Sequence, residues 1–588
     1  MKEYTFIVLI LIVAFFLRFY QLGENPPSLT WDEAAWGYNA YSLGTDGKDE
    51  FGRFLPLDYI ESFGDFKPPV YAYLDVIPVK ILGLSEFAVR FPSALFGVLT
   101  VLIAYFLVKT LFHLRGVHPR FAKASRGESA TSEVSKAENI ALLSAFLLAV
   151  SPWHIMLSRA AFEANVATFF IVLGVFLFLS AVNSVKSRGA VSSPPQGWKP
   201  IDTPGLGFLL LISFSVISFI LSIYTFNTAR VVAPILILVL AFGFRKELLK
   251  QKKETLLAIV LGIVLLLPVA NFLTSPQASL RFREVNIFSD IGVIENANQQ
   301  IENDDNAWWS KIIHNRRLIY GVSYLRHYLD NLNPDFLFIK GDGNPKFSTQ
   351  TVGQMYLWEL PFFIIGILYL IKRKEGYWWI VPTWLLIGII PAGLARETPH
   401  ALRIENSLPT FQIFTAYGIF FVTQRISNFK FQILNLKLWK LFAICYLLFA
   451  ISNFLYFFHD YLAHYPRMYS GEWQYGYKDS IEYVQSVQDN YSKIYVTSDS
   501  GRPYIYYLFY TKTDPRLFRK NNVVKRDVFG FVNIERFGKY DFLNKKKKAD
   551  NKNDKALFVQ TPLNVPAKSK ILKKFYLLNN SESLVAYE

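Results

Sequence analysis

Long apolar runs recur along most of this chain, and their length limits the folds that it can adopt. A helix needs about 20 apolar residues to cross the hydrocarbon core of a bilayer, and unpaired backbone groups are excluded from that core. The runs at 139–153 and 230–244 are the shortest of the set. We expect an α-helical polytopic membrane protein with about eleven transmembrane helices, at 4–20, 87–112, 139–153, 164–183, 205–223, 230–244, 255–273, 355–371, 377–394, 405–424 and 438–457.

The composition favours a membrane protein over a soluble one, because 52% of the 588 residues are hydrophobic and only 18% are charged. A formal net charge of +16 is compatible with nucleic-acid binding, but much of the excess lies in short loops between apolar runs. We therefore expect no nucleic-acid partner and interpret the charge as an orientation signal. The positive-inside rule predicts that these loops are cytoplasmic: Lys109–Lys136, Lys186–Lys199, Arg245–Lys253, Lys372–Lys374 and Arg425–Lys440.

This topology predicts a multi-pass protein of the cytoplasmic membrane, with its N-terminus in the cytoplasm and its C-terminal region outside. The first apolar run has no small-residue cleavage pattern behind it, so we interpret it as a retained anchor. We expect two domains: a transmembrane domain, 1–457, with external loops 21–86 and 274–354, and an external C-terminal domain, 458–588. The latter combines a helical pattern at Ser480–Val487 with the strand-like stretches "KIYVT" and "ALFV", which indicates a small α/β fold.

Ionisable residues cluster at the predicted outer face of the membrane. Charges near a bilayer are costly and are usually paired or functional. A lipid-linked sugar flippase or transporter is expected to place them near the midplane, whereas an enzyme acting on a lipid headgroup places them at the surface. A non-catalytic sugar-binding membrane protein remains a further alternative. The residues are Asp32, Glu33, Asp65, Lys67, Glu86, Arg90, Arg159, Glu163, Arg230, His400 and Arg403.

The stretch "TWDEAAWGY" contains two adjacent carboxylates. Thr30 and Glu33 match a capping box, so Glu33 has either a capping role or a functional one. Asp32 has no such structural task beyond the helix dipole. Partial desolvation by neighbouring aromatic side chains suits it to accept a proton from a hydroxyl. The aromatic residues that we expect around the substrate are Trp31, Trp36 and Tyr38.

Several basic side chains are candidates for binding a phosphate. Lys67 is held extended before Pro68, where it either binds phosphate or snorkels to the interface. Arg230, His400 and Arg403 either complement a phosphate or mark the ends of membrane spans.

Two i,i+4 pairs of opposite charge are expected to act mainly as structural braces. They are Glu86 with Arg90, and Arg159 with Glu163. The sequence contains no HExxH, CxxC or close acidic triplet, so we expect no metal and no cofactor.

An ordered set of motifs resembles bacterial and archaeal GT-C glycosyltransferases of family 39, the protein O-mannosyltransferase and aminoarabinose-transferase type. The motifs are "WDEAAWGYNA", "GDFKPPVYAYL", "LSEFAVRFPSALFG", "SPWHIMLSRAAFEAN", "YTFNTARVVAP", "YLDNLNPDFLFIKGD", "GQMYLWELPFFIIGI" and "TPHALR". The oligosaccharyltransferase branch is less similar, because its Trp-Trp-Asp-Tyr-Gly motif is missing from the tail.

This resemblance implies a GT-C fold and sugar transfer from a polyprenyl-phosphate donor. The acceptor that it implies is a protein, a cell-surface glycan or a lipid, and the lipid-linked sugar donor is a substrate, so no cofactor is expected. It implies that Asp32, in the Asp32–Glu33 pair, is the base, that Lys67 binds the phosphate, and that Glu163 contacts sugar or acceptor, with Asp65 nearby. We expect single displacement with inversion at the sugar carbon.

Overall fold

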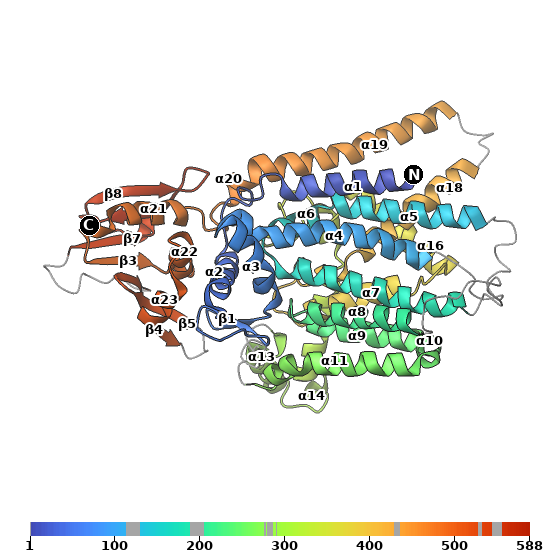
Figure 1. Ribbon diagram of the computed structural model, residues 1–588, viewed down its shortest axis with the longest axis horizontal. Coiled ribbons are helices and arrows are strands. Elements are labelled where there is room, and N and C mark those ends of the chain that lie inside the picture. The colour runs from blue at the N-terminus through green and yellow to red at the C-terminus, as the bar shows by residue number, and fades with distance from the viewer. Residues whose placement is uncertain are drawn as a thin grey trace.

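The computed structural model describes residues 2–112, 130–188, 205–275, 278, 286–289, 291–428, 436–526, 532–543 and 555–588. Figure 1 shows an elongated molecule in which a helical bundle is followed by a layer of short helices and then by a sheet domain. The N-terminus lies away from the sheet domain, which contains the C-terminus.

Every one of the apolar runs in the sequence forms a helix of the bundle. Within the described residues, five helices are long and apolar enough to cross a membrane, or six if a bent pair counts as one span. The protein is thus a multi-pass membrane protein, while about eleven crossings stay a prediction. The bundle helices are α1 (Lys2–Phe19), α4 (Glu86–Phe112), α5 (Ala130–Val150), α7 (Glu163–Arg188), α8 (Leu206–Ile223), α9 (Ala229–Gly243), α11 (Lys252–Leu273), α16 (Leu360–Arg373), α17 (Ile380–Gly393), α18 (Thr410–Asn428) and α19 (Leu436–His459).

Short helices join some of these elements at their ends. One is α10 (Arg245–Lys250), and another is α6 (Pro152–Arg159), which follows α5 with a bend of 55°. The bend occurs where Ser151 caps α6 and Pro152 begins it, because proline cannot continue the hydrogen bonding of the preceding helix. Parts of the loops predicted to be cytoplasmic, 113–129, 189–204 and 429–435, lie outside the described residues.

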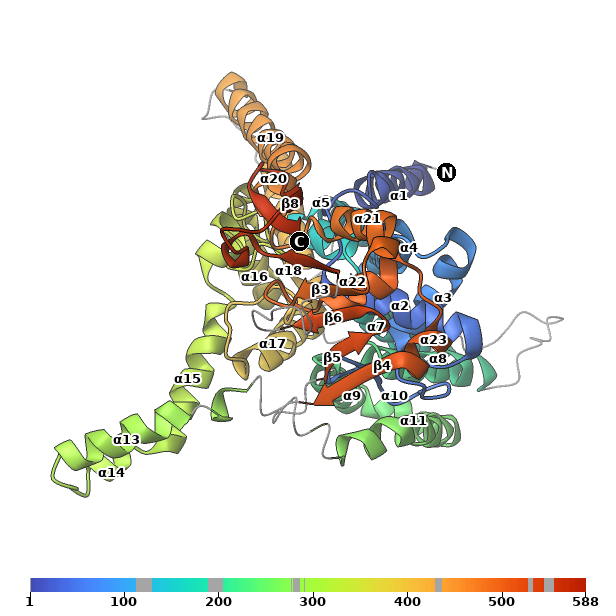
Figure 2. The same ribbon diagram turned by 90° about the vertical axis from the view of Figure 1, so that its left-hand side faces the viewer.

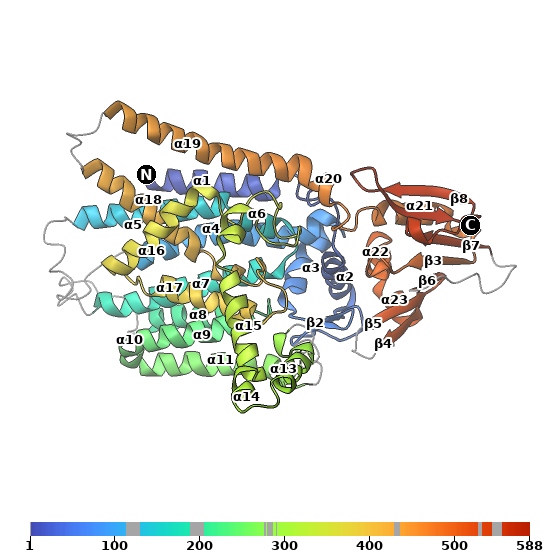
Figure 3. The same ribbon diagram turned by 180° about the vertical axis from the view of Figure 1, so that it is seen from behind.

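The first external loop folds into a layer at the end of the bundle. It contains α2 (Trp31–Asp46), the hairpin strands β1 (Ile60–Ser62) and β2 (Asp65–Lys67), and α3 (Val70–Leu82). The predicted capping box at the start of α2 is confirmed, because Thr30 and Glu33 exchange both hydrogen bonds. This layer lies between the bundle and the sheet domain in Figures 1 and 3.

The second external piece contains a group of helices that leave the bundle sideways, as Figure 2 shows. Residues 276–277, 279–285 and 290 of this piece lie outside the described part of the chain. Its short elements are η1 (Ile287–Ser289), α13 (Ile291–Asn303), α14 (Ser310–Ile313), α15 (Arg316–Asp330), the π-helix η2 (Asp335–Ile339) and η3 (Leu357–Glu359). A further 3-10 turn, η4 (Glu405–Ser407), precedes α18.

The C-terminal sheet domain confirms the α/β pattern of the tail. In the described part of this domain, seven strands follow the order β4-β5-β6-β3-β7-β9-β8, and β3 runs parallel to both of its neighbours. The stretches "KIYVT" and "ALFV" form β3 and β7. The elements are η5 (Asp460–His464), α20 (Tyr465–Tyr469), α21 (Tyr477–Val487), η6 (Gln488–Asn490), β3 (Lys493–Thr497), α22 (Pro503–Tyr510), α23 (Pro515–Asn521), β4 (Asn522–Arg526), β5 (Val532–Phe537), β6 (Tyr540–Leu543), β7 (Ala556–Gln560), η7 (Pro562–Asn564), β8 (Ile571–Tyr576) and β9 (Glu582–Tyr587).

The sheet domain and the first external loop share one apolar core. Polar contacts cross the same boundary: Tyr504 donates to Glu50 at 2.9 Å, and the Val532 amide donates to the Phe63 carbonyl at 3.0 Å. The proposed boundary at 457/458 stays a prediction, because α19 and η5 form a continuous helical connection across it.

Candidate active site at the end of the bundle next to the sheet domain

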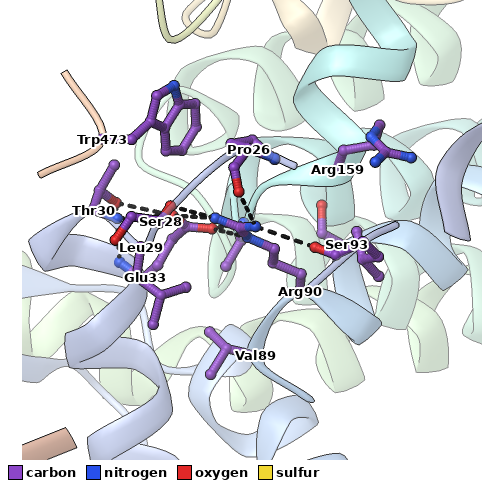
Figure 4. Close-up of polar contacts among 12 residues, drawn as sticks. Pro26, Ser28, Leu29, Thr30, Glu33, Val89, Arg90, Ser93, Arg159 and Trp473 are labelled. Atoms are coloured by element: carbon purple, nitrogen blue, oxygen red, sulfur yellow. Dashed lines mark hydrogen bonds and ion pairs between the residues drawn. The ribbon is translucent and has the colours of Figure 1, made fainter. Parts of the chain in front are cut away.

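Two buried arginines hold the segment that leads into α2. The Arg90 guanidinium donates to the carbonyls of Leu22, Pro26 and Ser28 at 2.5–3.1 Å. Figure 4 shows Pro26, Ser28 and Glu33 around the Arg90 guanidinium. The guanidinium carbon lies 5.8 Å from the centre of the Trp473 ring. Arg159 donates to carbonyls at the end of α1 and beyond it, including Leu17, Tyr20 and Asn25. A cation at the end of a helix also opposes the partial negative charge of its free carbonyls.

The Glu33 carboxylate is fully engaged by protein groups (Figure 4). Its Oε1 accepts from Arg90 Nε at 2.9 Å and from the Ala161 amide at 3.0 Å, while Oε2 accepts from the Thr30 amide at 2.9 Å. Glu33 therefore joins α2, α4 and the turn after α6. Its catalytic role stays a prediction, and its visible task is to position α2.

The expected i,i+4 pairings are wrong, because Glu86, Arg90 and Arg159 make their polar contacts with groups on other elements. Arg90 pairs with Glu33, and Glu86 pairs with Lys478 of the sheet domain at 3.0 Å. Arg159 binds backbone carbonyls, whereas Glu163 lies within electrostatic range of Lys67. Tertiary partners that offer better-placed acceptors replace the pairs that helix spacing alone suggested.

Asp32 and Lys67 form an ion pair at the mouth of this arrangement. The Asp32 side chain is 50% exposed, while that of Lys67 is only 6% exposed. The Lys67 ammonium also lies 5.0 Å from the centre of the Trp36 ring, within the range of cation–π attraction. The solvent-accessible Asp32 carboxylate is thus paired with a buried ammonium that packs on the Trp36 ring.

Further charged residues surround the pair. Asp65 and Glu163 both lie within electrostatic range of Lys67. Burial acts to lower the pKa of Lys67, but Asp32, Asp65 and Glu163 outweigh it and raise the pKa, so the side chain is a cation at neutral pH.

Arg230 approaches the cluster from α9, with Asp65 among its electrostatic neighbours. Its guanidinium carbon lies 5.3 Å from the Phe272 ring centre. Within the described residues, its buried Nε and one Nη have no hydrogen-bond partner. A buried guanidinium with unused donors is suited to an oxyanion.

The three aromatic residues expected around the substrate have different positions. Trp31 is half-buried between Lys346 of the second external piece, 5.2 Å from its ring, and the Gly501 turn of the sheet domain. Trp36 is buried beneath Lys67. Tyr38 is buried against the sheet domain, where its hydroxyl donates to the Thr513 carbonyl at 3.2 Å, so the structure does not bring it to Asp32.

His400 and Arg403 lie in the turn between α17 and η4. Burial and then Arg403 lower the pKa of His400 to about 3, so its imidazole is neutral at neutral pH and would contact a phosphate only as a hydrogen-bond donor. Its ring packs 4.9 Å from that of Phe347. Arg403 donates to the Glu397 carbonyl at 2.9 Å. Their phosphate-binding roles stay predictions.

Sequence reasoning missed two carboxylates of this end of the bundle. Asp342 accepts from the amides of Ala401 and Asn344, and burial raises its pKa to about 6. Glu405 is buried within electrostatic range of Glu163. Asp342 is the last residue of the motif "YLDNLNPDFLFIKGD", so the family resemblance could have drawn attention to it. Glu405 lies in none of the quoted motifs. Within the described residues, no group of three or more His, Cys, Asp or Glu is arranged to hold a metal ion.

Comparisons with known sequences find a family model that matches part of this site and one relative. A family model described as dolichyl-phosphate-mannose-protein mannosyltransferase matches residues 66–118, which include Lys67 and Arg90. An Aquifex aeolicus protein described as uncharacterized is 28% identical over 173 residues. That alignment spans 29% of this chain and 28% of the relative.

Comparisons of structure extend over the whole chain. The apo crystal structure of ArnT from Cupriavidus metallidurans aligns with a TM-score of 0.50 and 11% identity, covering 100% of this chain and 98% of that one. The chain has the GT-C fold. This fold and the family-model match confirm the resemblance to the protein O-mannosyltransferase and aminoarabinose-transferase type.

Two other solved structures are similar to this GT-C chain. ArnT from Cupriavidus metallidurans bound to undecaprenyl phosphate aligns with a TM-score of 0.48 and 12% identity, over 98% of this chain and 97% of that one. The apo oligosaccharyltransferase of Archaeoglobus fulgidus aligns with a TM-score of 0.48 and 14% identity. The alignment covers 86% of this chain but only 63% of the archaeal one.

Proposed function

We propose that this protein transfers a sugar from a polyprenyl-phosphate donor to an acceptor hydroxyl at the outer face of the cytoplasmic membrane. The observation that carries the proposal is the Asp32–Lys67 ion pair, with an accessible carboxylate held by a buried cation at one end of a membrane bundle. The family model that matches residues 66–118 is named for a dolichyl-phosphate-mannose donor, and this match supports the donor class. No cofactor beyond the donor is part of the proposal.

Donor binding changes the partner of Lys67. The structure pairs the ammonium with Asp32. A phosphate entering beside Arg230 offers Lys67 a second anionic partner, and the unused Arg230 donors add charge-assisted hydrogen bonds. Asp32 then exchanges its ammonium partner for the acceptor hydroxyl, which links donor binding to activation of the base.

We propose a single displacement at the anomeric carbon of the donor sugar. The acceptor oxygen attacks the anomeric carbon from the face opposite the phosphate, and its proton passes to the Asp32 carboxylate. The bond from carbon to phosphate oxygen breaks, the electron pair leaves with polyprenyl phosphate, and the anomeric centre is inverted. Lys67 and Arg230 stabilise the charge that develops on the leaving group.

The remaining residues position the reactants. Glu33 and Arg90 hold the start of α2, and therefore Asp32, against the bundle. Asp65 and Glu163 lie around Lys67 and supply acceptors for sugar or acceptor hydroxyls. Trp31, between the second external piece and the sheet domain, offers a ring for an acceptor protein or a cell-surface glycan.

The test uses purified protein in lipid bilayers with a panel of polyprenyl-phosphate sugars and a crude cell-envelope acceptor. We expect wild type to release polyprenyl phosphate from one donor, and Asp32→Asn to lose this release. Glu582→Gln is the matched control, because Glu582 also pairs with a lysine, Lys574 at 2.6 Å, but on the sheet domain. Movement of labelled donor across the bilayer without consumption of any donor would contradict the proposal and favour a flippase.

A further inference from the structure

The second external piece carries a lateral arm, defined here as residues 291–330 with helices α13, α14 and α15. Viewed along the bundle in Figure 2, the arm extends sideways beyond the other helices at the lower left. Figure 3 shows it beside the end of the bundle that meets α2 and α3. The bundle axis is the direction in which the helices cross a membrane, so the arm runs across that axis.

Contacts at the root of the arm fix its depth. The Tyr328 hydroxyl of α15 donates to the Leu386 carbonyl of α17 at 2.8 Å, and Tyr324 packs against Gly393 at the end of that helix. The His327 ring lies 2.8 Å from the Ala395 carbonyl, just beyond α17. The last turns of α15 therefore pack against α17 between its middle, at Leu386, and its C-terminal end, which the predicted topology places at the outer boundary of the bilayer.

The surface of the arm is unusually apolar for a segment outside the bundle. Trp308 is 76% exposed, and the neighbouring exposed side chains include Trp309, Ile312 and Ile313. Along α15, exposed apolar residues repeat every three or four positions, as on one face of a helix. They are Leu318, Val322, Leu325 and Leu329.

Basic residues accompany this apolar surface. Lys311, Arg316 and Arg317 are all exposed between the tryptophans and the α15 stripe. Among the acidic residues of the arm, Asp304 accepts from Ser310 at 2.7 Å and lies 3.4 Å from His314, whereas Glu295, Glu302 and Asp305 are exposed on α13 and in the turn that follows it. The basic side chains lie on the other part of the arm, on α14 and at the start of α15. The combination of tryptophan, aliphatic and cationic side chains is typical of a segment that lies in the interfacial region of a membrane.

We propose that the lateral arm is an interfacial anchor that binds the anionic phospholipid headgroups of the outer leaflet. Trp308, Ile312 and Ile313 enter the headgroup boundary, and Lys311, Arg316 and Arg317 contact lipid phosphates. Each basic residue near an anionic surface strengthens binding about five-fold. The inference does not depend on the proposed transferase activity.

The anchor is tied to the candidate active site through the end of α15. Asn331 follows this helix, and its side chain donates to the His327 carbonyl and accepts from the His400 amide at 3.0 Å. Membrane contact by the arm therefore steadies the turn that contains His400 and Arg403.

The experiment places a fluorescent probe on the arm of the full-length protein in vesicles. Cys445, the one cysteine of the chain, is first removed by Cys445→Ser. Probes are then attached at Trp308→Cys, at Val322→Cys as a second arm position, and at Leu563→Cys as the control, because Leu563 is 95% exposed on the sheet domain. Quenching by nitroxides on the lipid headgroup and by aqueous iodide is compared in phosphatidylcholine with and without phosphatidylglycerol.

We expect both arm probes to be quenched several-fold more by the lipid nitroxide than the control probe, and the control to be quenched mainly by iodide. Phosphatidylglycerol should increase the lipid quenching, and Lys311→Gln/Arg316→Gln/Arg317→Gln should remove this increase. Strong iodide quenching of both arm probes would overturn the proposal. Protection from both quenchers would overturn it as well, because it would indicate cover by protein, including a second copy. An unchanged response to phosphatidylglycerol in the triple variant would reject the anionic headgroup as the ligand.

Discussion

Arg90 and Glu33 are the buried charges on which the position of Asp32 depends. Their side chains are 0% and 1% exposed, and they form an ion pair at 2.9 Å. Removing one partner leaves the other charge buried without compensation, which costs about 3–5 kcal/mol. We expect Glu33→Gln and Arg90→Leu each to lower the thermal unfolding temperature sharply, and the double variant to recover part of the loss. Wild-type stability of both single variants would contradict a bracing role.

We expect Glu50 to make the docking of the sheet domain dependent on pH, because it is buried at that contact and accepts a hydrogen bond from Tyr504. Burial raises its pKa from 4.5 to about 8, although the hydrogen bond from Tyr504 opposes the shift. Because the folded-state pKa is raised, the stabilisation is complete below about 4.5 and is lost as pH rises through about 8. We expect thermal stability to fall as pH rises from about 5 to about 8, and Glu50→Gln to reduce this slope. An equal slope in the variant would show that Glu50 is not the responsible group.

The residue types of the candidate site were partly predictable from sequence. "TWDEAAWGY" specified the capping box, and "GDFKPPVYAYL" pointed to Lys67 as an anion ligand. The partner of Arg90 was not predictable, because Glu86 at helix spacing and Glu33 in a distant loop are indistinguishable until the chain is folded. Tyr38 was placed near the substrate by its sequence neighbours, but helical rotation turns it toward the sheet domain.

At the scale of elements, α2 is the contact between the bundle and the sheet domain. A Cβ at Gly37 would lie 2.6 Å from Phe509 of α22 and 2.5 Å from Val89 of α4. We expect Gly37→Ala to destabilise the protein by about 1–3 kcal/mol and to make the sheet domain more susceptible to proteolysis. The matched control is Gly207→Ala in α8, where a Cβ would meet no heavy atom within 4 Å. Equal protease resistance in both variants would contradict tight packing at Gly37.

The apolar spans and the strands β3 and β7 were predictable because their signals are local: continuous hydrophobicity and short β-rich runs. The order of the sheet was not, since β3 pairs with β6 and β7, which follow it by more than forty residues of chain. The bend at Ser151 and Pro152 has a sequence signal, but its angle depends on packing in the bundle.

At the scale of the whole molecule, the three pieces that are predicted to be external meet around one site. The first loop supplies Asp32 and Lys67, and the second piece and the sheet domain reach Trp31 from two sides. The sheet domain also shares the apolar core of the first loop. Because the sheet domain contacts Trp31, we hypothesise that it helps to bind the acceptor. Surface substitutions test this hypothesis better than deletion of the domain, because deletion would expose the shared core.

The most direct measurement is a comparison of donor binding and donor turnover in Asp32→Asn and Lys67→Ala, with protein in lipid and a labelled polyprenyl-phosphate sugar. We predict that Asp32→Asn binds donor at least as well as wild type, because Lys67 is free for the phosphate, while turnover falls about 10²- to 10⁴-fold. Lys67→Ala should instead bind donor about 10- to 100-fold more weakly. Turnover by Asp32→Asn at the wild-type rate would contradict the assignment of Asp32 as the base.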